Sequence, residues 1–385
     1  MMMVHVPLGP SYSPDSFSLG VDAAPPRASL WSSSLIILSK LAGLLDLVAV
    51  RLSPDVFLAD GMGDDVVYAK AFALGLEKGP NVAPAELTIE REVAAAHDGG
   101  IATAVVSFRS PVADLLEEEA KTARAEIVAP VTGPPPQRLE DLVAGADVVI
   151  HCPMTGDIGF SFRRRSYALP LATSTGAVSI ILQIAFYGPR RPASMGGRYG
   201  LPTVAHVASQ GAAVFTEARA LAEWARAAGS RTITYAGVSF GGAMASMAAL
   251  LDPQSHAVIS TVGTHSPAPP FSQGLLAQTV DWPAIGGRYG PVGRALWAIS
   301  TDAIPAPSTS TSCKRIARIL YAADDKYIPR EASASLYDAL GASSATVSLT
   351  RAAMPGGHGW AIMCARRRHV AAIVDAVAAQ LQLVD

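Results

Sequence analysis

Residues 232–246 of this chain read TITYAGVSFGGAMAS. The first five are mostly β-branched or aromatic, as in a buried strand, and the uncharged run from residue 242 onward favours a helix. Between them stands Gly237-x-Ser239-x-Gly241, whose small residues let a strand turn sharply into a helix. Such a turn strains the backbone of its serine and exposes the hydroxyl at the end of the strand. A glycine-rich turn in which the serine is incidental is the alternative that this pattern leaves open.

Outward from this unit, short β-rich runs alternate with alanine-rich helical runs from about residue 100 onward. This alternation predicts an α/β fold class with a mostly parallel central sheet and helices on both faces. We expect strands at 102–108, 126–130, 147–151, 177–184, 232–238, 257–262, 316–322 and 345–349. The expected helices are 204–228, 242–251, 330–340 and 365–381.

The chain divides into three parts by composition. Residues 1–28 are rich in proline and serine without periodicity, which predicts a disordered N-terminus. Residues 29–100 are expected to form a helical extension, in which Leu30–Leu52 could lie on the core or on a membrane surface. Residues 101–385 form the main α/β domain. Within it, the proline-rich segment 264–314 predicts a short cap-like insertion over the sheet edge.

The composition excludes several classes of protein. The 385 residues are 50% hydrophobic and 16% charged, and the net charge of −2 comes without a basic block. These values argue against disorder of the whole chain and against nucleic-acid binding. Two charge-free stretches, 167–189 and 232–251, are long enough to span a bilayer. Glycine and polar residues interrupt both, so we expect buried sheet elements instead.

The cysteine count bears on compartment and metal binding. Cys152, Cys313 and Cys364 form neither a disulfide framework nor a set with metal-ligand spacing, so we expect a reducing, intracellular compartment and no metal. There is no nucleotide-binding glycine motif, and we expect no cofactor. No basic residue precedes Arg27, which argues against a secretory signal. A mitochondrial location stays open, although no clear transit peptide is present.

A reactive serine needs a base, and the base needs an acid that orients it. Asp325 follows the expected strand 316–322 and precedes Pro329 by four residues, which fits the acid better than Asp324 does. His358 stands between glycines after the expected strand 345–349 and before the last helix. The order Ser239, Asp325, His358 at successive strand ends predicts a catalytic triad. His256, His265 and His369 fit the base less well by position, although His265 could line the pocket.

An oxyanion needs two N–H donors beside the serine. The helix start offers the backbone N–H of Phe240. The second donor is expected in the turn after strand 147–151. Pro153 has no N–H, so that donor is Met154 or Thr155. We expect His151 to brace this turn rather than to react.

Several segments resemble the alpha/beta-hydrolase domain-containing protein 18 family over residues 151–358. The resemblance implies an α/β-hydrolase fold, a serine-hydrolase triad at Ser239, Asp325 and His358, and action on a lipid acyl ester. The chain has Met154 where the family pattern has glycine, and a shorter insertion. The segments are His151 with Thr155-Gly156-Asp157, Phe162-Arg163-Arg164-Arg165-Ser166, Tyr187-Gly188-x-Arg190-x-Pro192, Gly237 to Ser246, Asp325-x-Tyr327-Ile328-Pro329-Arg330 and Gly356-Gly357-His358.

Four arginines follow strands that lead to the expected site: Arg163, Arg164, Arg165 and Arg190. Guanidinium groups bind phosphate well, so they predict a substrate-binding cluster for an anionic head group. With the aromatic residues of the insertion, this makes a phospholipid a candidate substrate. The alternative is a solvated helix start with a core ion pair to Asp157.

Three functional hypotheses remain. The first is a serine esterase or lipase that forms an acyl-enzyme with a small-molecule acyl ester, with no nucleic acid and no inferred protein partner, and with peripheral membrane contact open. The second is a catalytically silent binding or scaffold protein on the same fold, which Pro153 and Met154 favour. The third is acyl transfer to an acceptor other than water.

Overall fold

A computed structural model of the chain describes residues 46–47, 56–76, 82–93, 100–131, 136–301 and 313–384. The expected disordered segment 1–28 lies outside these residues. So does the expected helix Leu30–Leu52, except for Asp46 and Leu47. None of the helices among the described residues is long and apolar enough to cross a membrane.

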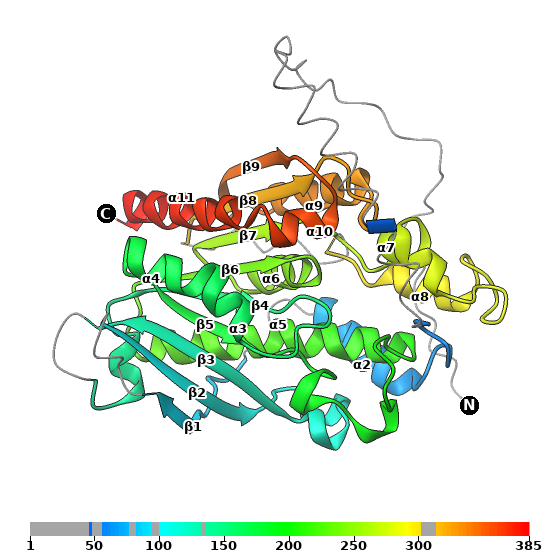
Figure 1. Cartoon of the computed structure of the whole chain (residues 1–385), viewed down its shortest axis with the longest axis horizontal. Coiled ribbons are helices and arrows are strands. Elements are labelled where there is room, and N and C mark those ends of the chain that lie inside the picture. The colour runs from blue at the N-terminus through cyan, green and yellow to red at the C-terminus, as the bar shows by residue number, and fades with distance from the viewer. Residues whose placement is uncertain are drawn as a thin grey trace, which may run out of the picture.

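A nine-stranded sheet, counted over the described residues, organises the fold (Figure 1). From β5 to β9 in the spatial order, all neighbouring strands are parallel, whereas β1, β2, β3 and β5 pair antiparallel. The prediction of a mostly parallel sheet is therefore confirmed. In spatial order the strands are β1 (Thr88–Val93), β2 (Ile101–Arg109), β3 (Thr122–Pro130), β5 (Val178–Leu182), β4 (Asp147–Cys152), β6 (Thr232–Val238), β7 (Ala257–Thr261), β8 (Arg315–Ala322) and β9 (Thr346–Met354).

The first strand corrects the expected boundary at residue 101. β1 lies within 29–100, where we expected only helix, and it pairs with β2. Its sequence, TIEREV, has no apolar run because the side chains from Thr88 to Arg91 are exposed at the edge of the sheet. Backbone pairing and the ion pair of Glu90 with Arg124 of β3, at 2.9 Å, hold it there. Among its described residues, the extension thus contributes a strand as well as helix, including α2 (Asp65–Leu76).

Helices cover both faces of the sheet, as predicted. Val148 and Ile150 of β4 pack into the main core, which also takes up α5 (Val204–Ala227), α6 (Phe240–Leu251) and α9 (Arg330–Gly341). Val149, between them, faces the opposite side and packs with α4 (Leu169–Thr175) and α11 (Arg366–Val384). This alternation follows from the two-residue period of a strand. It buries β5 and β6 on both faces. With α4 and α6, these strands make up most of the two charge-free stretches, which are therefore sheet and helix segments of the core.

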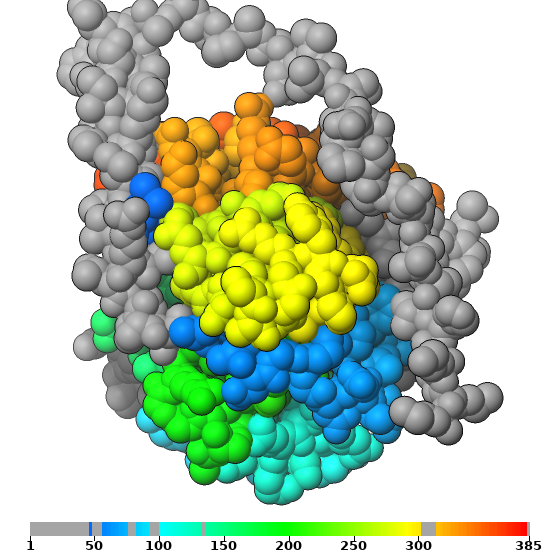
Figure 2. All heavy atoms as spheres, turned by 90° about the vertical axis from the view of Figure 1, so that its right-hand side faces the viewer, coloured from blue at the N-terminus to red at the C-terminus, as the bar shows by residue number. Residues whose placement is uncertain are grey.

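The remaining helices lie near the edge where the parallel strands end. α3 (Ser161–Arg163) continues through a π-helical turn (Arg164–Ala168) into α4, and α10 (His358–Met363) follows β9. The insertion forms α7 (Ala268–Ser272) and α8 (Pro291–Ala298). Figure 2 looks onto this end of the molecule, where the insertion (yellow) lies between residues 56–76 (blue) and the C-terminal part (orange). The insertion therefore forms the middle of this face of the molecule (Figure 2).

Candidate active site

The turn from β6 into α6 has the strained geometry that the sequence predicts. Ser239 has φ 58° and ψ −125° and caps the start of α6. A Cβ on Gly237 would lie 2.1 Å from the carbonyl oxygen of Gly241, and a Cβ on Gly241 would lie 2.5 Å from that of Cys152. Glycine is required at both positions because backbone from α6 and from β4 fills the space a side chain would take. The close approach brings the turn after β4 beside Ser239.

Three side chains from different strand ends meet above this turn. His358 Nε2 lies 2.9 Å from Ser239 Oγ, and His358 Nδ1 lies 2.9 Å from Asp325 Oδ2. Asp325 follows β8 and His358 opens α10. The second oxygen of Asp325 accepts hydrogen bonds from the backbone N–H groups of Tyr327 and Ile328, each at 2.9 Å. The structure thus brings Ser239, His358 and Asp325 together, with Asp325 rather than Asp324 on the histidine ring.

The electrostatics of His358 suit proton transfer. Burial alone would lower its pKa, but the charge and hydrogen bond of Asp325, with a further contribution from the charge of Asp46, outweigh burial, so the pKa lies above its ordinary value. An ionised carboxylate only accepts hydrogen bonds, so the Nδ1 of a neutral His358 carries the proton. Its Nε2 is then left to accept the proton of the Ser239 hydroxyl. Such a pair can raise the nucleophilicity of a serine.

Two of the three expected oxyanion residues line the cavity beside Ser239: Phe240 and Thr155. Met154 instead lines a smaller cavity behind the turn, with His151 and His369. The Tyr199 hydroxyl donates to the Thr155 carbonyl at 3.3 Å, and a Cβ on Gly156 would lie 1.9 Å from that hydroxyl oxygen. Tyr199, from the first of two Gly-Gly-Arg-Tyr-Gly segments, therefore supports this loop. Its counterpart in the second segment, Tyr289, is 79% exposed.

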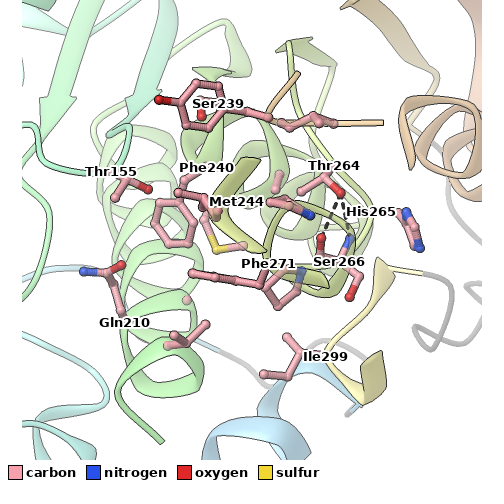
Figure 3. A pocket seen from close by; sticks show the side chains of 18 of the residues that line it. Thr155, Gln210, Ser239, Phe240, Met244, Thr264, His265, Ser266, Phe271 and Ile299 are labelled. Atoms are coloured by element: carbon pink, nitrogen blue, oxygen red, sulfur yellow. Dashed lines mark hydrogen bonds between the residues drawn. The ribbon is translucent and has the colours of Figure 1, made fainter. Parts of the chain in front are cut away.

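A cavity of about 110 Å³ begins at Ser239 and extends between α5, α6 and the insertion (Figure 3). Its walls carry no Asp, Glu, Lys or Arg among the described residues. Two polar side chains of the wall bind backbone carbonyls: Gln210 donates to Ala185 and Ser266 donates to Leu296. His265 lines it too, as expected. Its apolar lining includes Phe57, Leu201, Val207, Phe240, Met244, Met247, Phe271, Leu276, Ile299 and Ile328.

The arginines correct our prediction of a head-group cluster. Arg190 is 1% exposed and binds both oxygens of Glu217, at 2.9 and 2.6 Å. Arg163 is buried against Asp157 at 2.6 Å, as the alternative interpretation expected, and Arg164 pairs with Glu126. Arg165 is exposed to solvent. None of the four arginines lines the cavity at Ser239. Arg163, Arg164 and Arg190 instead neutralise carboxylates inside the protein.

His151 and His369 have structural contacts. His151 Nε2 lies 3.0 Å from Ser179 Oγ, and burial places its pKa well below the ordinary value. His369 Nδ1 lies 2.8 Å from Thr261 Oγ1, and burial lowers its pKa to about 3. Both rings lie against Tyr167, behind β6. Sequence reasoning missed a residue on the other side of His358, Asp46, which gave no signal beyond a charge within an apolar stretch.

Comparison with known proteins agrees with this architecture. The model of the family described as "Alpha/beta hydrolase domain containing 18" matches residues 74–290, more than half of the chain. The acetyl xylan esterase from Paenibacillus sp. R4 is 18% identical with a TM-score of 0.52, over 85% of this chain and 99% of that one. Acetyl xylan esterase 1 from Thermoanaerobacterium sp. JW/SL YS485 is 13% identical with a TM-score of 0.50, over 81% and 93%. At these identities, the two structures show a shared α/β-hydrolase fold.

Proposed function

Because the chain belongs to the alpha/beta hydrolase domain containing 18 family, we propose that it is a serine hydrolase that cleaves a carboxylic ester with an apolar, lipid-like acyl group. One observation carries the proposal: the hydrogen-bonded series Ser239, His358, Asp325 stands beside a cavity whose described lining residues include no Asp, Glu, Lys or Arg. A reactive hydroxyl there would meet the ester carbonyl while the acyl chain enters the cavity.

The proposed reaction runs through an acyl-enzyme. His358 Nε2 takes the Ser239 proton as Oγ bonds to the carbonyl carbon, and the Phe240 and Thr155 N–H groups receive the oxyanion. The imidazolium returns this proton to the departing alkoxide as the C–O bond breaks. Water then gives a proton to His358 as its oxygen bonds to the acyl carbon. The imidazolium returns that proton to Ser239 Oγ as the bond between Oγ and the acyl carbon breaks, which frees the carboxylic acid and restores the serine hydroxyl. Asp325 holds the charged ring throughout.

The cavity supports an apolar acyl group as the recognised part of the substrate. Side chains such as Met244, Phe271 and Leu276 offer dispersion contacts and exclude water, whereas a charged acyl group would be buried without a partner. The phospholipid head-group hypothesis is not part of the proposal, because Arg163, Arg164 and Arg190 already neutralise internal carboxylates.

A fluorophosphonate probe tests the proposed nucleophile. We expect covalent labelling of the folded protein, with the adduct mapped by mass spectrometry to Ser239 and lost after heat unfolding. Ser266→Ala is the matched control, because this second cavity serine donates to the Leu296 carbonyl and should not be activated. Labelling of another serine contradicts the proposed nucleophile. No labelling of the folded protein also contradicts the proposal and favours a silent binding protein.

The cavity also predicts acyl-chain selectivity. Met244 lies on α6 between Phe240 and Met247 in the wall of the cavity (Figure 3), so Met244→Trp should fill part of it. We expect kcat/KM for p-nitrophenyl octanoate to fall roughly tenfold or more, and that for the acetate ester to change little. Met244→Leu conserves volume and should keep both values close to wild type. Equal losses on both esters in the Trp variant would place the acyl chain elsewhere.

A further inference from the structure

Asp46 approaches the active site from the N-terminal side of the chain. Its carboxylate accepts hydrogen bonds from the backbone N–H of His358 at 2.7 Å and of Gly359 at 3.0 Å. The residue is 3% exposed. A carboxylate 312 positions before His358 in the sequence thus binds the residue whose ring faces Ser239.

Two carboxylates therefore hold the same histidine from different sides. Asp325 binds the Nδ1 of the ring, and Asp46 binds the main chain of His358 and of the next residue. Burial raises the pKa of Asp46 above its ordinary value, although the two backbone hydrogen bonds and the charge of His358 oppose that rise. Hydrogen bonds to the ionised carboxylate are about twice as strong as those between neutral groups, so this second attachment restrains the backbone from which the ring extends. The fit is close: a Cβ on Gly359 would lie 3.2 Å from Asp46 Oδ1.

We propose that Asp46 is a positioning residue for His358, which fixes its backbone at the start of α10 and adds a second negative charge beside the imidazole. The inference rests on the proposed function, since positioning matters only if His358 transfers a proton. Asp46 need not touch the substrate; it acts through the histidine. The N-terminal region thereby supplies a part of the site that no strand end provides.

The charges around His358 determine the direction in which its pKa changes when the charge of Asp46 is removed. The ring faces Asp325, Tyr327 (ring centroids 5.0 Å apart) and the Ser239 hydroxyl, and the Asp46 carboxylate lies at its main chain. Tyr327 is neutral in the working range, because burial above all raises its pKa to about 12. Asp325 and Asp46 both favour the imidazolium. Removing the Asp46 charge therefore lowers the pKa of His358, and more of it stays neutral as the pH falls.

The test compares Asp46→Asn and Asp46→Ala with wild type. We expect the acid limb of kcat/KM against pH to shift to lower pH in both variants, and kcat at its plateau to fall about tenfold or more in the alanine variant, because a displaced catalytic base loses its alignment. Asp64→Asn is the matched control: Asp64 accepts from the N–H groups of Val66 and Val67 at the start of α2, without a contact to His358. It should leave the profile unchanged.

A second readout separates this inference from the proposed function. An NMR titration of the His358 ring, assigned with His358→Gln, follows the same pKa in the free protein without any substrate. A lower pKa in Asp46→Asn supports the electrostatic part even if the fluorophosphonate experiment fails. If the Asp46 variants lower the melting temperature but leave both the acid limb and plateau kcat unchanged, Asp46 is only an anchor, and the inference is wrong. Should they fail to fold, Gly359→Ala displaces the carboxylate without removing it and should lower kcat in the same direction.

Discussion

Replacing Ser239 with alanine is expected to lower kcat for an apolar acyl ester by on the order of 10⁴- to 10⁶-fold, to a residual rate set by the rest of the site. The hydroxyl is the only group of the relay that can form the acyl bond, and alanine has no atom at its place. The backbone φ of 58° strains alanine no more than serine, because both residues carry a Cβ, so the fold should persist. Hydrolysis of p-nitrophenyl esters and circular dichroism measure the two separately.

Asp325 and its neighbour give the matched pair for this prediction. Asp325→Asn keeps the shape of the side chain but offers an amide where Nδ1–H needs an acceptor, and a loss of roughly 10⁴-fold in kcat is expected. Asp324, one residue earlier, donates its backbone N–H to the Gly356 carbonyl, whereas the carboxylate bound to the ring of His358 is that of Asp325. Asp324→Asn should therefore stay close to wild type. A Ser239→Ala protein as active as wild type would show that the measured hydrolysis arises elsewhere.

Replacing Glu217 with alanine is expected to destabilise the fold by about 3–5 kcal/mol, because it leaves the guanidinium of Arg190 buried without its counter-charge. Arg190 is 1% exposed and Glu217 fully buried, and the arginine also donates to the carbonyls of Ala120 and Gln183. The pair thus joins α5 to the segments before β3 and after β5. A fall in melting temperature of about 10 °C is the expected observation.

Two comparisons give this prediction its meaning. The double variant Arg190→Met/Glu217→Leu should be less destabilised than Glu217→Ala, because no charge stays buried alone. Arg198→Ala, in a pair with Asp60 that is more than half exposed, should cost about 0–1 kcal/mol. If the Glu217→Ala protein had wild-type stability and a raised KM for an anionic ester only, the result would instead indicate that Arg190 binds the substrate.

The sequence was most informative where a strand is buried on both faces. The range predicted for β6 is the range observed, and β4 and β7 differ by one residue, since an uninterrupted apolar run has few alternative fates. β9 extends five residues beyond its predicted end at residue 349, and three of the added positions, Thr350, Ala352 and Ala353, are exposed. β1 was missed for the same reason. Only a buried strand needs a regular pattern of apolar residues, so the sequence of an exposed edge strand does not reveal it.

The proposed site divides in the same way. Ser239, Asp325 and His358 could be chosen because the ends of parallel strands gather at one edge of a sheet, so sequence order translates into proximity. Partner choice has no such rule. That Arg190 binds Glu217 on α5 depends on how α5 packs against the sheet, and nothing near residue 46 announces its contact with residue 358.

That last contact has a consequence for when the protein becomes competent. Asp46 and His358 are separated by 312 positions, so the loop that joins them closes almost the whole chain. The entropic cost of closing a loop grows with its length, although slowly, and the contacts that form within the intervening chain must offset it. Synthesis proceeds from the N-terminus, and Asp46 leaves the ribosome long before its partner exists. The histidine is therefore fully held only at the end of folding, and incomplete nascent chains carry Ser239 without the means to activate it.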